Sequence, residues 1–265
     1  MSWVPQVTRA RPSVRGWRTL ADEVLAAAEQ SGERAAAAYA RTALGGAAYR
    51  RGDIDGCLAH GQAALEYFRS VADHSRQARL HNLMAVALGD RGWHAEQKQH
   101  LYRAYELRTL AGNVRSQAVV LANLGELHNA TGQYATARSE LERAFDLVDA
   151  VRDPSFGLHC HHHLGCAYAG LGDDRLAAEQ YHRALRLARQ LGDHYLTGHT
   201  LRGLAALERK SGDAGRAELL LREALLAYRT SRDRQEIAQT LAELAVLRDG
   251  VAVGTAFVEL GGLSA

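Results

Sequence analysis

Glycine recurs at a fixed interval of forty residues along most of this chain. The same interval separates a column of alanines and a column of large apolar residues. The three columns are Gly52, Gly92, Gly132, Gly172 and Gly212; Ala64, Ala104, Ala144, Ala184 and Ala224; and Leu44, Met84, Leu124, Leu164, Leu204 and Leu244. A fixed period of about 20–50 residues is typical of chains that stack copies of one small unit. The sequence therefore predicts a repeat array rather than one globular core.

Each forty-residue unit has the pattern of two helices joined by a tight turn. Apolar residues between the glycines recur at helical spacing, as in Leu121, Leu124 and Leu127. Glycine accepts the left-handed backbone that follows a helix C-terminus. The acidic or amide residues at the turns are suited to cap the next helix N-terminus. These predicted caps are Asp53, Asp73, Asn113, Asp153, Asp173, Asp193, Asp213 and Asp233.

The register predicts where each helix begins and ends. The first helices of the pairs are expected over 36–51, 75–91, 115–130, 154–170, 194–210 and 235–248. The second helices are expected over 54–70, 94–110, 134–150, 174–190 and 214–230. Residues 13–30 form an upstream second helix without a partner, and there Trp17 replaces a small residue as an end cap. The alanine column, with Gly125 and Gly165, allows the helices to approach closely.

The clearest unit, residues 154–193, resembles the tetratricopeptide repeat. It contains His161, Leu164, Gly165 and Tyr168, then Ala177, Tyr181 and Ala184, with His161 in the tryptophan position of that pattern. The resemblance covers roughly residues 13–248, although the unit has forty residues instead of about 34. It implies an all-α fold, a right-handed superhelix of twelve or thirteen antiparallel helices.

Three segments follow from this register. Residues 1–12 are an N-terminal extension. Residues 13–250 are a single array, made of a half repeat, five full repeats and a final first helix. Residues 251–265 are a tail or a short capping helix.

Composition narrows the classes of function. A net charge of +2 and a pI near 8.5 are too mild to indicate nucleic acid binding by this region. The sequence has no apolar run long enough to span a membrane and no signal peptide. Its three cysteines, Cys57, Cys160 and Cys166, are odd in number and fall within predicted helices, so we expect a cytoplasmic protein without disulfides. Thirty of its 32 basic residues are arginine, and with abundant alanine this is typical of a GC-rich bacterial genome.

The resemblance implies that the first helix of each pair lines a concave groove. In that frame Asn123 matches a position where such proteins often clamp a ligand backbone amide. Arg79 and Arg202 are suited to carboxylates or phosphates. The expected groove residues are Tyr39, Arg79, Asn82, Asn123, Glu126, His159, His162, His163, His199 and Arg202.

A histidine-rich segment, residues 159–163, is the strongest local anomaly. His159, His162, His163 and Cys166 share one helical stripe, and His199 occupies the column of His159 one repeat later. Histidine and cysteine are natural zinc ligands, and His159, His163 and Cys166 are the metal candidates. Ligands from one straight helix rarely reach tetrahedral geometry, however, and we expect no metal or cofactor. A patch for an acidic or aromatic partner, pH-sensitive because an unperturbed imidazole has a pKa of about 6.5, is the favoured reading.

No motif indicates catalysis. The sequence contains no glycine-rich phosphate loop, nucleophile elbow or HExxH segment. We expect a scaffold that binds a protein or peptide segment. The units resemble the carboxy-terminal sensor regions of bacterial SARP and STAND-type regulators, in endings such as residues 189–193. The alternatives are a free-standing adaptor or peptide sensor, and a metal-binding protein or enzyme built on residues 159–166.

Overall fold

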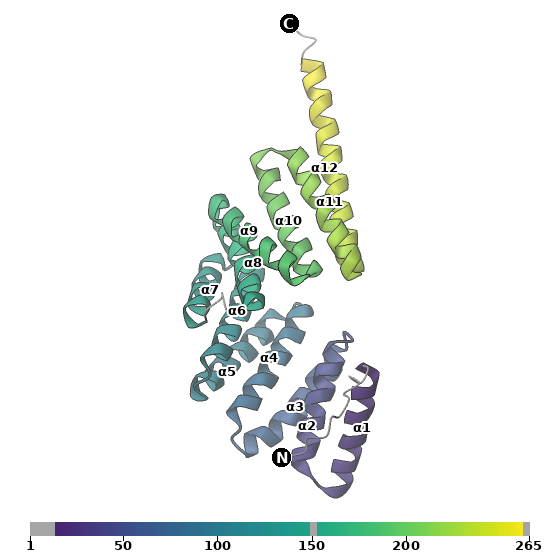
Figure 1. The fold of residues 1–265 in the computed structure, drawn as a ribbon, viewed down its shortest axis with the longest axis vertical. Coiled ribbons are helices and arrows are strands. Elements are labelled where there is room, and N and C mark those ends of the chain that lie inside the picture. Colours follow the sequence, from purple (N-terminus) through teal and green to yellow (C-terminus); the bar gives the residue numbers. More distant parts are fainter. Residues whose placement is uncertain (1–13, 149–152, 262–265) are drawn as a thin grey trace, which may run out of the picture. The chain divides into compact units, whose positions relative to one another are not determined.

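A computed structural model describes the backbone of residues 14–148 and 153–261 and the side chains of residues 19–148 and 153–248. The predicted extension 1–12, the side chain of Trp17 and the side chains of the predicted tail lie outside the described residues. Over the described backbone the protein forms twelve α-helices and no strand, as the sequence predicts (Figure 1). None of the described helices is both long enough and apolar enough to cross a membrane.

The chain divides into two compact units, one up to Ser116 and one from Gln117. The first unit contains five complete helices: α1 (Val14–Ser31), α2 (Arg34–Tyr49), α3 (Ile54–Ser70), α4 (His74–Asp90) and α5 (His94–Leu110). In it, α2 packs on α1 and α3, and α4 packs on α3 and α5.

The second unit contains most of α6 and the six helices that follow it. They are α6 (Val114–Ala130), α7 (Tyr134–Leu147), α8 (Pro154–Leu171), α9 (Asp174–Leu191), α10 (His194–Ser211), α11 (Ala214–Ser231) and α12 (Arg234–Gly261). From α7 to α12 each helix packs on the next, and α8 also touches α10. The first helices of consecutive pairs are therefore neighbours, which brings their side chains to one face.

The turns have the predicted chemistry. Every predicted cap accepts a hydrogen bond from the backbone N–H three residues later, for example Asp173 from Leu176 at 3.0 Å and Asp213 from Arg216 at 2.8 Å. All five glycines of the predicted column have positive φ, between 73° and 92°. The side-chain caps satisfy backbone N–H groups that the start of a helix leaves unpaired, and the glycines let the chain reverse after the end of a helix.

The repeated small residues bring the paired helices close together. All five alanines of the 64-to-224 column are fully buried, and the apolar column from Leu44 to Leu244 is buried as well. A Cβ placed on Gly125 would lie 2.5 Å from Leu141, and one on Gly165 would lie 2.5 Å from the Tyr181 ring. Side chains at these two positions would separate α6 from α7 and α8 from α9, which explains the small residues there.

The last helix is longer than the sequence predicts. The sequence predicts that this helix ends near residue 248. That prediction is wrong, because the backbone of α12 continues as a helix to Gly261 without a break. Residues 251–261 thus extend the final first helix instead of forming a separate short one. The extent of the array, residues 13–250, stays a prediction.

Candidate functional site

The expected groove residues all lie on the first helices of their pairs. In the first unit Tyr39 is on α2, and Arg79 and Asn82 are on α4. In the second unit Asn123 and Glu126 are on α6, and His199 and Arg202 are on α10; the others are on α8. Their side chains differ widely in exposure: Tyr39, Arg79 and Glu126 are exposed, whereas His162 is buried.

Tyr39 and Arg79 line a pocket of about 370 Å³ in the first unit. Its apolar wall comes from Leu20 and Val24 of α1, both more than a third exposed, and its far side comes from α2. The complete lining, called here the α2 pocket, is Leu20, Ala21, Val24, Tyr39, Ala40, Thr42, Ala43, Gly46, Ala47, Arg50 and Arg79. Residues expected in the groove from repeats one and two therefore share one cavity.

The α2 pocket is positively charged at its edge. Arg50 and Arg79 both contribute to its lining. Nearby, burial lowers the pKa of Arg108, and the positive charge of Arg79 lowers it further. Because like charges raise the local potential, a carboxylate placed here would be stabilised.

In the second unit Glu126 faces two histidines of the neighbouring first helix. Its Oε2 lies 3.5 Å from Nε2 of His159 and 3.8 Å from Nε2 of His163. The two imidazoles are one helical turn apart, with ring centroids separated by 4.4 Å. Asn129, one turn after Glu126, donates its side-chain N–H to the backbone carbonyl of His163 at 2.8 Å, which holds α6 against α8.

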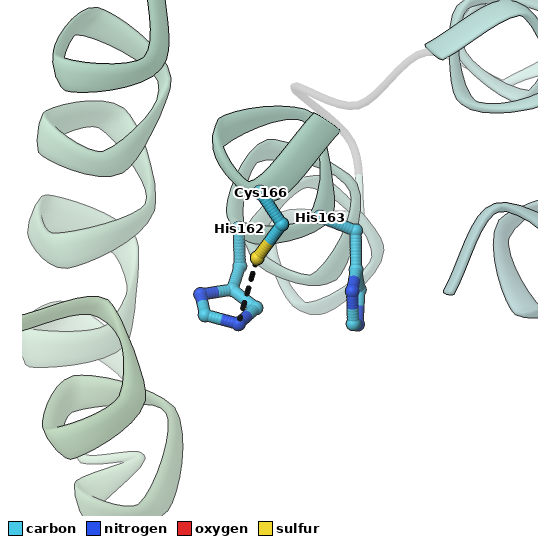
Figure 2. Close-up of side chains that lie close together, drawn as sticks. All are labelled: His162, His163 and Cys166. Atoms are coloured by element: carbon cyan, nitrogen blue, oxygen red, sulfur yellow. Dashed lines mark hydrogen bonds between the residues drawn. The ribbon is translucent and has the colours of Figure 1, made fainter. Parts of the chain in front are cut away.

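His162 belongs to the packed interior between α8 and α10. Its Nδ1 lies 3.1 Å from Oγ1 of the buried Thr200, and its Nε2 lies 3.8 Å from Sγ of Cys166 (Figure 2). The Tyr181 hydroxyl donates to the same sulfur at 3.5 Å. Figure 2 shows the His162 ring beside Cys166, with the His163 ring on the other flank of the helix.

Burial keeps these imidazoles neutral. It lowers the pKa of His159 to about 4 and that of His162 to about 3, where the neighbouring His199 and His159 add to the effect. The pKa of His163 is likewise well below its ordinary value. The expectation of a pKa near 6.5 is therefore wrong for this cluster, because desolvation disfavours the charged ring. His159 and His162 therefore remain uncharged at pH 6.

His199 and Arg202 face α12. The His199 ring packs edge to face against Tyr195, with ring centroids 4.4 Å apart, and against Tyr228 at 5.4 Å. Arg202 forms ion pairs with Glu236 and Glu243, so its guanidinium already holds two carboxylates of this chain. In this structure Arg202 links α10 to α12.

The remaining predicted residues are partly buried. Asn82 and Asn123 are half-buried, on α4 and α6 respectively. His161, in the tryptophan position, packs its ring 4.9 Å from that of Phe145, and its Nδ1 lies 2.8 Å from Oε1 of Gln180. It fills the space between α7, α8 and α9, as expected for that position.

Sequence reasoning missed several contributors. Leu20 and Val24 line the α2 pocket, and their spacing of one helical turn was a signal that the sequence offered. Tyr195 precedes His199 by one turn, so the helical period would have placed it beside that ring. Glu236 and Glu243 could not be identified as ion-pair partners of Arg202, because the sequence does not show which residues lie opposite it.

Two groups of three residues bring metal-ligating atoms within 4.8 Å of one another over the described residues. One is Glu126, His159 and His163, and the other is His162, His163 and Cys166. His163 belongs to both.

Comparison with known proteins supports the repeat assignment. The family model of the tetratricopeptide repeat matches residues 116–190, and no curated protein sequence matches the chain. Among solved structures the chain is similar to BtubC (BKLC) from P. vanneervenii, with 16% identity and a TM-score of 0.66, covering 83% of this chain and 93% of that one.

Two further structures are similar over most of this chain. A Signal Transduction ATPase with Numerous Domains (STAND) protein with a tetratricopeptide repeat sensor, from Pyrococcus horikoshii, shares 16% identity at a TM-score of 0.68. The match covers 88% of this chain but only 34% of that protein. A Rap protein complexed with Competence and Sporulation Factor shares 16% identity at a TM-score of 0.59, covering 90% of this chain and 72% of that one.

The helical pairs, the turn chemistry and these matches agree with one another. The chain therefore contains tetratricopeptide repeats at residues 116–190 and has, along its described helices, the fold of tetratricopeptide-repeat proteins.

Proposed function

We propose that this protein is a non-enzymatic scaffold that binds an extended segment of another protein, with the α2 pocket receiving an apolar side chain next to an acidic group. The observation that carries the proposal is the lining of that pocket. It joins the exposed apolar side chains of Leu20, Val24 and Tyr39 with the guanidinium groups of Arg50 and Arg79.

The size of the α2 pocket suits a side chain. Its volume of about 370 Å³ lies near the lower end of the ~300–1,000 Å³ that small-molecule sites occupy. Fully burying one leucine or phenylalanine stabilises a complex by about 1.5–3 kcal/mol. One anchoring side chain gives modest affinity, and further contacts along the segment add to it.

The charge of the α2 pocket favours an acidic segment. Arginine presents a planar fork of donors that matches a carboxylate. Arg79 is exposed and close enough to Arg108 for their charges to interact, so an incoming carboxylate would relieve that repulsion. The recognised feature would be an aspartate, a glutamate or a terminal carboxylate beside an apolar residue.

The setting we propose for this scaffold is the sensor region of a larger bacterial signalling protein. The similarity to a STAND protein with a tetratricopeptide repeat sensor is compatible with this, and so is the similarity to a Rap protein complexed with a factor. The sequence of the complete gene product tests the setting: an adjoining ATPase or DNA-binding domain would support it, and a gene product ending with the array would favour a free-standing adaptor.

Peptide selection tests the binding function directly. The full chain is immobilised and challenged with a displayed library of random peptides, and enriched peptides are titrated by fluorescence anisotropy. We expect enriched sequences to pair an apolar residue with an acidic one. Tyr39→Ala and Arg79→Glu should each weaken binding at least tenfold, because they remove one wall and the charge of the α2 pocket.

The matched control is Arg103→Glu. Arg103 lies on α5, is exposed and is absent from the pocket lining, so it carries the same charge change to another surface. Equal loss of affinity in Arg103→Glu and Arg79→Glu would mean that the net charge of the protein, and not the α2 pocket, determines binding. Failure to enrich any peptide, or unchanged binding by both pocket variants, would contradict the proposal.

A further inference from the structure

We propose that Glu126, His159 and His163 form a three-ligand site for a zinc ion, with the fourth coordination position open. The site lies in the second unit and is independent of the α2 pocket. One carboxylate and two imidazoles are the ligand types that zinc accepts in sites with an open position.

The two separations that involve the Glu126 carboxylate are close to those around a tetrahedral ion. Bonds of about 2.0–2.2 Å at tetrahedral angles place ligand atoms about 3.3–3.6 Å apart. The observed distances from Oε2 of Glu126 are 3.5 Å to Nε2 of His159 and 3.8 Å to Nε2 of His163. The two imidazole nitrogens lie within 4.8 Å of each other, so closing the set around an ion brings the two rings together by about an ångström at most.

The ligands come from two helices, which removes the geometric objection to a site on one straight helix. His159 and His163 are one turn apart on α8, so both rings extend from the same side. Glu126 approaches from α6 and supplies the third direction. The hydrogen bond from Asn129 to the His163 carbonyl fixes the two helices at this point.

The His159 ring contains a polar atom in need of a partner. Its Nε2 is enclosed, although 31% of the whole side chain is exposed, and it makes no hydrogen bond to any described residue. A buried nitrogen without a partner destabilises the fold by about 1–3 kcal/mol, unless an ion or water completes it. A zinc ion between His159 and Glu126 would supply that partner.

The half-exposed Glu126 carboxylate gives an ion access from solvent. The same opening leaves the fourth position for water or for a carboxylate or imidazole from another molecule. The alternative group of His162, His163 and Cys166 is less suited. Its three members fall within five positions of one helix, and His162 and Cys166 already contact Thr200 and Tyr181.

Metal titration of the full chain tests the site. Chelator-treated protein is titrated with Zn²⁺ by calorimetry and with Co²⁺ by visible absorption, which is intense for tetrahedral coordination. We expect one ion per chain and no thiolate charge-transfer band. Glu126→Gln and His159→Ala should each weaken binding at least tenfold, whereas Cys166→Ser should bind as the parent does.

His182→Ala is the matched control, because His182 is an exposed histidine on α9 outside both groups. Circular dichroism confirms that each variant folds. Three results would overturn the proposal: no stoichiometric zinc, parental affinity in both Glu126→Gln and His159→Ala, or loss of the ion in Cys166→Ser with retention in Glu126→Gln. The last result would move the ion to the alternative group.

Discussion

The Tyr181 ring is packed between two glycines of the second unit. A Cβ on Gly165 of α8 would lie 2.5 Å from the ring, and one on Gly203 of α10 would lie 2.6 Å from it. The tyrosine itself is 4% exposed, so it has little room to move. Glycine is required at these two positions by the close approach and not by the backbone angle.

We predict that Gly165→Ala destabilises the protein by about 1–3 kcal/mol, because the added methyl overpacks a rigid contact. Gly46→Ala is the opposite case. Gly46 is also within a helix, but a Cβ there meets only the end of Arg50 at 3.7 Å. Alanine should stabilise that helix by about 0.5–1 kcal/mol. Urea unfolding of both variants measures the difference, and a shift of the same sign in the two would contradict the packing argument.

A histidine pair, one buried and one half-buried, links pH to the stability of the first unit. Nδ1 of His81 on α4 lies 3.1 Å from Nδ1 of His100 on α5. Burial lowers the pKa of His81 to about 4, and the charges of His100, Arg69 and Arg103 lower it further. Burial also lowers the pKa of His100, and Arg69 adds to the effect.

The sign of the pH dependence follows from these shifts. The unfolded chain takes up a proton at His81 as the pH falls through about 6.5, whereas the folded protein does so only near pH 4. The stability from the neutral ring is therefore complete above about pH 6.5 and is lost between there and pH 4. We predict a loss of about 1–2 kcal/mol between pH 7 and pH 5 from this residue.

Urea unfolding at the two pH values checks the prediction. His81→Asn keeps a neutral hydrogen-bonding group near the Nδ1 position and should reduce the loss, whatever its own effect on stability at pH 7. The exposed His182→Asn should leave the loss unchanged. An identical pH dependence in parent and His81→Asn would show that the pair does not titrate as described.

At the scale of the elements, the residues that end helices in the left-handed conformation are glycines, with two exceptions among the residues that the structure describes. Ala72 after α3 has a φ of 52°, and Arg232 after α11 has a φ of 60°. Their counterparts Gly32, Gly112 and Gly192 have the same conformation at the ends of α1, α5 and α9. A side chain costs about 1–2 kcal/mol in this region, so these two turns are strained relative to their counterparts.

We predict that Ala72→Gly and Arg232→Gly each stabilise the protein by about 0.5–1 kcal/mol. The gain is smaller than the strain because glycine also increases the entropy of the unfolded chain. Thermal unfolding measures it, with Gly192→Ala as the reverse substitution, which should destabilise. A loss of stability in both glycine variants would mean that the side chains contribute more than the backbone strain costs.

Helices and caps could be predicted from the sequence because their causes are local. A glycine at a turn or an aspartate before a helix acts on backbone groups within four residues. The low pKa values of His159 and His162 and the ion pairs of Arg202 could not be predicted in this way, since they depend on side chains across the packed helices. The continuation of α12 past Gly250 was missed because glycines there indicated a stop.

Across the whole molecule, the repeat register accounts for the fold better than for the sites. Equivalent positions of successive repeats share one structural role, as the buried alanine column shows. The two proposed sites depend instead on positions where the repeats differ: Tyr39 and Arg79 in one pocket, and Glu126 opposite two histidines. The periodic pattern does not show which of these differing residues come into contact. That depends on how neighbouring helices pack.

The sequential packing of helices within each unit also affects how the protein is made. From α1 to α5, and again from α7 to α12, each helix packs against the next one along the chain. Chains dominated by contacts between nearby residues fold rapidly, because little loop entropy is lost before packing begins. A helical pair can therefore begin to pack while later repeats are still being synthesised, and its outer apolar face stays exposed until the next helix packs on it.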